Sequence, residues 1–101
     1  MKEKEVLLKM LRQLLDDLQN VQQKGTGYYT CEPFVSRYNK ILEFAKNAFR
    51  KDSSLLETFV PVGNTDSVDP LDKMKVMQKV MIEGDQLMVV LASTKEAPTE
   101  P

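Results

Sequence analysis

The chain of 101 residues contains no histidine and no tryptophan, and its single cysteine is Cys31. The absence of histidine excludes Ser–His and Cys–His nucleophiles, imidazole bases and His-ligated zinc. A single cysteine excludes an intramolecular disulfide, which a secreted domain of this size usually needs, so we expect a cytoplasmic protein. Positive charge is not in excess, because 14 Lys and Arg residues face 15 Asp and Glu residues. A dedicated nucleic-acid-binding protein is usually strongly basic.

Long apolar stretches are also missing. No segment approaches the run of about 18 apolar residues that a membrane-spanning helix needs. Lys9 and Arg12 interrupt the apolar run near the N-terminus, which argues against a signal peptide. We therefore expect no membrane segment and a single helical domain at residues 1–93, followed by a disordered tail at residues 94–101, where Thr, Lys, Glu and Pro predominate.

Residues 2–24 contain neither Gly nor Pro and are rich in Leu, Gln and charged residues, which predicts a first helix. Four leucines recur at steps of four, three and four residues, the spacing of an apolar stripe on one helix face. Flanking apolar residues widen the stripe to an arc of roughly 200°. Because one neighbour cannot cover such an arc, we expect two neighbours, one of which could belong to a second subunit.

A second helix is predicted at residues 33–50, because Pro33 suits the first turn of a helix and the apolar residues share an arc of roughly 140°. A capping-box spacing predicts a short helical turn at about 54–59. Residues 60–69 contain Pro, Gly and several turn-forming residues, which predicts one long loop.

A third helix is predicted at residues 70–92, with Asp69 as its N-cap and Pro70 in its first turn. Its methionines and Gly84 recur at steps of three and four residues, so the helical phase continues across the glycine. A glycine on an apolar stripe predicts close approach of a neighbouring helix. The alternative is a break of the helix at residues 83–85.

The predicted fold class is all-α, an antiparallel bundle of these three main helices plus the short turn. The first and third helices carry more apolar surface than we expect a three-helix chain to cover, with Ile82 and Val89 on a flank of the third. We therefore expect a homodimer that forms a larger bundle. The expected oligomer interface consists of Leu7, Leu11, Leu14, Leu18, Met77, Met81, Gly84 and Met88.

Candidate chemistry is sparse. Methionines at helical spacing are typical of a core rather than of a soft-metal site, and residues 64–69 lack the ligand spacing of a calcium loop. Cys31 has no base and stands beside Glu32, so we interpret it as an inert core residue. We predict no catalytic, cofactor-binding or metal-binding residues, and no enzyme activity. A hydrolase using a carboxylate-bound metal is a remote alternative, because the predicted core stripes contain no carboxylate.

Phe44 departs from the apolar arc of the second helix and lies among cations instead. It could pack beneath residues 53–62 or against a second subunit, anchor a partner protein, or stack on a nucleic-acid base. The expected partner surface comprises Arg37, Lys40, Phe44 and Lys51.

The sequence thus predicts a small non-catalytic cytoplasmic protein that acts by helix-mediated self-association and protein–protein interaction, as a scaffold or regulator. No motif identifies its family. The alternative is a nucleic-acid-associated regulator that uses the basic face of the second helix. That face comprises Arg37, Lys40, Phe44, Lys46, Arg50 and Lys51.

Overall fold

The computed structural model describes residues 3–24, 31–49 and 54–93. The elements in chain order are α1 (Glu3–Lys24), α2 (Glu32–Phe49), the 3-10 turn η2 (Ser54–Thr58) and α3 (Pro70–Ser93). All of these elements are helical, and the three long helices pack against one another. The predicted fold class of three main helices plus a short turn is therefore confirmed. The expected tail at 94–101 lies outside the described residues.

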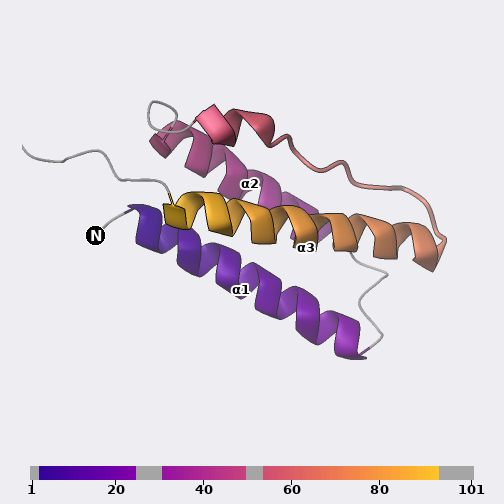
Figure 1. Ribbon diagram of the computed structural model, residues 1–101. Coiled ribbons are helices and arrows are strands. Elements are labelled where there is room, and N and C mark those ends of the chain that lie inside the picture. Colours follow the sequence, from indigo (N-terminus) through magenta and orange to yellow (C-terminus); the bar gives the residue numbers. More distant parts are fainter. Residues whose placement is uncertain (1–2, 25–30, 50–53, 94–101) are drawn as a thin grey trace, which may run out of the picture.

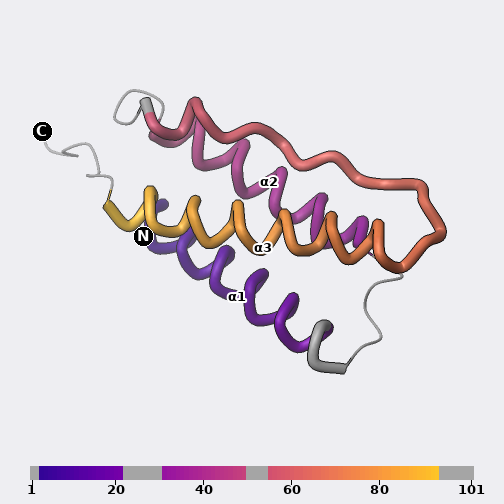
Figure 2. The backbone as a smooth tube through the Cα atoms, turned by 45° about the vertical axis from the view of Figure 1, so that its right-hand side comes forward, coloured from indigo at the N-terminus to yellow at the C-terminus, as the bar shows by residue number. Residues whose placement is uncertain are grey.

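The direction of the helices follows from the connector between α2 and α3. α1 runs antiparallel to both other helices, whereas α2 and α3 run in the same direction (Figure 1). After η2 the chain returns along the bundle as an extended connector, residues 59–69 (Figure 2). Such a segment can span about 36 Å, whereas the 18 residues of α2 rise about 27 Å. The predicted long loop is thus long enough to bring the chain back to the starting end of α2.

The core lies where the three helices and the connector meet. α1 contributes its leucine stripe, and α2 and α3 contribute one apolar face each. η2 adds Leu56, and the connector adds Phe59 and Val62. The largest side chains of the core that are fully buried are Leu11, Leu14, Leu18, Tyr38, Leu42, Leu56, Met77, Val80, Leu87 and Leu91.

The start of α3 has the predicted cap. The Asp69 side chain accepts a hydrogen bond at 3.0 Å from the backbone N–H of Leu71, one of the donors that the first helical turn leaves without a partner. Pro70 has no N–H to satisfy and occupies the first helical position. Asp72 in the same turn accepts a hydrogen bond from the Ser67 hydroxyl at 2.6 Å, which ties the connector to the helix.

α3 continues without a break through Gly84, and the alternative break at residues 83–85 does not occur. Gly84 is buried against α1, where a Cβ atom at this position would lie 3.3 Å from Cδ2 of Leu15. The close approach predicted from this glycine is confirmed. The missing side chain lets the backbone of α3 come within contact distance of the Leu15 methyl groups.

The residues expected at an oligomer interface form the interior of one chain. The four leucines of α1 are at most 4% exposed, Met77 and Gly84 are buried, and Met81 and Met88 are half-buried against the core. Both neighbours of the wide apolar arc of α1 are supplied by the same chain, because α2 and α3 both pack against α1, although Met10 at the edge of the arc stays 37% exposed. The four leucines, Met77 and Gly84 are therefore covered by their own chain, and Met81 and Met88 are the members of this set that stay partly accessible.

Candidate interaction groove between α1 and α2

Two large apolar side chains remain exposed where α1 and α2 face each other. Phe44 is 55% exposed and Met10 is 37% exposed. Each lies on its helix beside the buried apolar stripe. Neither side chain therefore points into the core or directly away from the bundle. The departure of Phe44 from the apolar arc therefore leaves its ring at the surface, where solvent and other molecules can reach it.

Two hollows flank this pair, and Met10 and Phe44 line both of them. The first, about 530 Å³, is also lined by Glu3, Val6, Leu7, Asn47 and Ala48. The second, about 350 Å³, is also lined by Lys9, Gln13, Arg37, Lys40 and Ile41. We call these two hollows, with Met10 and Phe44 between them, the Phe44 groove. It is a shallow apolar channel with a polar residue at each end, a typical form for a binding site.

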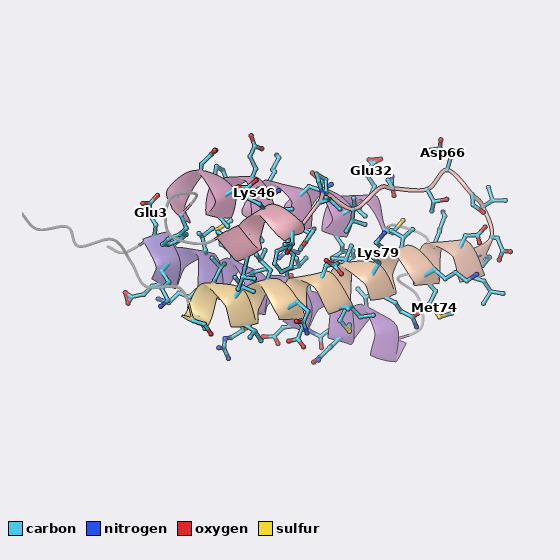
Figure 3. The ribbon with its side chains drawn as sticks, turned by 45° about the horizontal axis from the view of Figure 1, so that its top comes forward. Glu3, Glu32, Lys46, Asp66, Met74 and Lys79 are labelled. Atoms are coloured by element: carbon cyan, nitrogen blue, oxygen red, sulfur yellow. The ribbon has the colours of Figure 1, made fainter. Side chains whose placement is uncertain are left out.

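The charge of the groove changes along its length. Glu3, in the first turn of α1, lies exposed at one end (Figure 3). Lys9 and Lys40 are exposed at the other end and have no ion-pair partner among the described residues. The groove therefore favours a partner with negative charge beside the two lysines and without negative charge beside Glu3.

Arg37 lies at the basic end, but its charge is offset. Its guanidinium group contacts the Asp17 carboxylate of α1 at 2.9 Å, and the Gln13 side chain donates a second hydrogen bond to the same carboxylate at 3.0 Å. Arg37, followed by Gln13, holds the pKa of Asp17 below its ordinary value of 3.8. The carboxylate is ionised at neutral pH, so this pair joins the ends of α1 and α2 and leaves Lys9 and Lys40 as the cations of the groove.

The predicted basic face of α2 is divided by the structure. Arg37, Lys40 and Phe44 lie together in the groove. Lys46 instead lies beside η2 on the connector side of α2, where its ammonium group donates to the Phe59 carbonyl oxygen at 2.6 Å (Figure 3). Arg50 and Lys51 lie outside the described residues. The face is therefore narrower and less basic than the sequence pattern indicated.

A larger hollow, about 690 Å³, lies between α2 and the connector, and three of its polar side chains, Asn39, Lys46 and Asn64, hydrogen-bond groups of the same chain. The Asn39 side chain donates to the Val62 carbonyl oxygen at 3.0 Å and accepts from the Val62 N–H at 2.9 Å. Sequence reasoning missed Asn39. The available signal was a polar side chain at the edge of the apolar arc, together with a long loop whose backbone groups needed partners.

Two buried polar groups lie outside the groove. Cys31 is a buried free thiol whose Sγ donates to the Asn64 side-chain oxygen at 3.2 Å. The Tyr38 hydroxyl is buried without a hydrogen-bond partner in the described structure, and burial, followed by the charge of Glu83, raises its pKa. Within residues 3–24, 31–49 and 54–93, no three Cys, Asp or Glu side chains come close enough to hold a metal ion.

Comparison with protein-family models, with curated proteins and with solved structures finds no match to this chain. None of the described helices is both long enough and apolar enough to cross a membrane. Among the surfaces of the described residues, the Phe44 groove combines an exposed aromatic ring, apolar hollows and a change of charge.

Proposed function

We propose that the protein is a small non-catalytic interaction protein that binds an amphipathic helix of a partner protein in the Phe44 groove. The observation that carries this proposal is the exposed ring of Phe44 between two apolar hollows. Aromatic side chains that lie next to pockets for a partner's side chains are the usual anchors of protein interfaces. A buried free thiol at Cys31 supports a reducing compartment such as the cytoplasm.

The spacing of the hollows suits a helix. From one hollow to the other, the lining residues advance by about four to six positions along α1 and along α2. This corresponds to a distance of about 6–9 Å along the bundle. Apolar side chains at positions i and i+4, or i and i+7, of one helix bridge this range. Glutamates near one end of that helix would meet Lys9 and Lys40, and the other end would lie beside Glu3.

A protein partner is favoured over a nucleic acid by the local charge. The predicted basic face has three described cations: Asp17 offsets the charge of Arg37, the Lys46 ammonium group is directed to the connector, and Lys40 remains in the groove. Glu3 at the far end of the groove would repel a phosphate backbone.

Self-association is the second part of this proposal. Leu71, Ile82 and Val89 on α3 are each more than half exposed, although the predicted leucine interface is enclosed by its own chain. Light scattering of the full chain from micromolar to millimolar concentration tests it. A mass that rises toward that of a dimer is expected, and a monomer throughout would contradict it.

The groove is tested with a synthetic helical peptide of about four turns that carries leucines at i, i+4 and i+7 and glutamates at one end. We expect micromolar binding by fluorescence anisotropy, and at least tenfold weaker binding to the Phe44→Ala protein. Leu55→Ala, which shortens an exposed apolar side chain on η2, is the matched control and should bind normally. A double Lys9→Glu, Lys40→Glu protein should reject this peptide and bind its lysine counterpart.

Several results would contradict the groove proposal. They are no binding of the acidic peptide, equal binding by Phe44→Ala, or equal binding of the acidic and basic peptides. Tight, salt-dependent binding of single-stranded DNA that is lost in Phe44→Ala would support the nucleic-acid alternative instead.

A further inference from the structure

The outer face of α3 carries exposed apolar residues in one line. Leu71 is 60% exposed, Ile82 is 61% exposed and Val89 is 57% exposed. Their spacing places them within about 20° of one another around the helix and nearly opposite the buried stripe. This face is turned away from α1 and α2, so no other element of the described bundle covers it.

Polar residues complete the line. Lys75, Gln78 and Asp85 are exposed, and with the three apolar residues they follow one another at steps of four, three, four, three and four. This is the spacing of a seam along which two helices pack. We call Leu71, Lys75, Gln78, Ile82, Asp85 and Val89 the outer seam of α3.

The ends and the charged positions of the outer seam match those of a second α3 helix that runs in the opposite direction. Leu71 and Val89 are equally distant from position 80, and so are Lys75 and Asp85, and Gln78 and Ile82. In an antiparallel pair of α3 helices centred at that level, apolar side chains meet at both ends, opposite charges meet between them, and Gln78 lies beside the partner's Ile82 at the centre. In a parallel pair, lysine would face lysine and aspartate would face aspartate.

We propose that a second copy of this chain packs on the outer seam with its α3 antiparallel, so that Lys75 pairs with the partner's Asp85. A twofold axis produces this contact twice, along with two contacts between Leu71 and the partner's Val89. This inference rests on the proposed self-association and adds its surface, direction and register.

The geometry keeps the two proposed surfaces separate. The Phe44 groove lies between α1 and α2, and the outer seam lies on the side of α3 remote from both helices. A dimer formed in this way carries two open grooves, so it can hold two partner helices at once. The seam has few apolar residues, and the dimer is therefore weak and dependent on concentration.

Sedimentation equilibrium of the full chain tests the register by charge reversal. Lys75→Asp and Asp85→Lys, each alone, create like-charge contacts at both symmetric positions and should weaken dimerisation about tenfold. The double variant Lys75→Asp, Asp85→Lys should restore the wild-type constant, and so should an equal mixture of the two single variants. Lys9→Asp, the same change on α1, is the matched control and should leave dimerisation unchanged.

The outcomes separate the register from self-association. A dimer whose constant does not respond to Lys75→Asp, or that the double variant fails to restore, overturns the antiparallel seam while self-association stands. A dimer that persists unchanged in Val89→Glu also overturns the seam, because the glutamate would face the partner's Leu71 at both ends. A protein that is monomeric at every concentration overturns both. Binding of the acidic peptide by Lys75→Asp should remain normal, because the groove does not depend on the seam.

Discussion

The two flanks of α2 meet their neighbours in different ways. On the connector side, Asn39 and Lys46 hydrogen-bond backbone groups of a segment that has no regular hydrogen-bonding partners of its own. On the α1 side, Phe44 stays more than half exposed between two hollows. On the first flank the connector's backbone groups find partners on α2, whereas on the second a large aromatic ring stays open to solvent. A flank of the second kind is where we expect binding to other molecules.

Truncating one apolar residue on each flank gives the largest expected difference. Leu42, on the connector side, is 2% exposed, so Leu42→Ala leaves a cavity and should lower the free energy of unfolding by about 2–5 kcal/mol. Phe44→Ala removes a ring that is already largely in solvent and should cost about 1 kcal/mol or less. Urea unfolding followed by circular dichroism measures both values. Equal losses would mean that Phe44 is a core residue and that the two flanks do not differ.

The bonds of Asn39 give a smaller effect that tests the connector flank. Asn39→Ala leaves both the N–H and the carbonyl group of Val62 without their partner, at an expected cost of about 1–3 kcal/mol. Hydrogen exchange at the Val62 amide should accelerate as well. Asn47→Ala, an exposed asparagine on the same helix, should change stability by less than about 0.5 kcal/mol. If both variants lose the same amount, Asn39 does not hold the connector.

Tyr38, in the core between the flanks, gives the smallest effect. Its buried hydroxyl has no partner in the described structure, so Tyr38→Phe should leave stability unchanged or raise it by about 1 kcal/mol at neutral pH. Burial and Glu83 raise its pKa above the ordinary 10.0, so the folded state keeps the proton that the unfolded chain releases. Wild-type stability should therefore fall above pH 10, by up to about 1.4 kcal/mol per pH unit more than in Tyr38→Phe. Urea titrations on both sides of that pH measure this, and parallel curves would contradict it.

Much of the fold was predictable from local patterns. The apolar periodicity located three helices whose bounds agree with the structure within about two residues. Asp69 and Pro70 marked the start of α3, and Gly84 marked a close approach, because each of these residues has a specific backbone use. Phe44 could also be singled out from the sequence, because the helical projection shows that it departs from the apolar arc of α2.

The neighbours of each face were not predictable in the same way. The wide arc of α1 was consistent with a second subunit, yet α2 and α3 of the same chain cover its leucine stripe. Lys46 belonged to a basic face by its position on the helix, yet the connector passes on that side and binds it. A periodic pattern predicts which face of a helix is buried, but it does not predict which element packs against that face.

The residue pattern of this chain therefore specifies its helices, their caps and their inward faces, because these depend on contacts within a few residues along the chain. The path of the connector depends on contacts between residues far apart in the sequence, such as Asn39 with Val62 and Cys31 with Asn64. That path sets α2 and α3 in the same direction, and these two helices enclose the leucine stripe of α1. The folded arrangement consequently selects which apolar surfaces stay exposed, among them the Phe44 groove and the outer seam of α3.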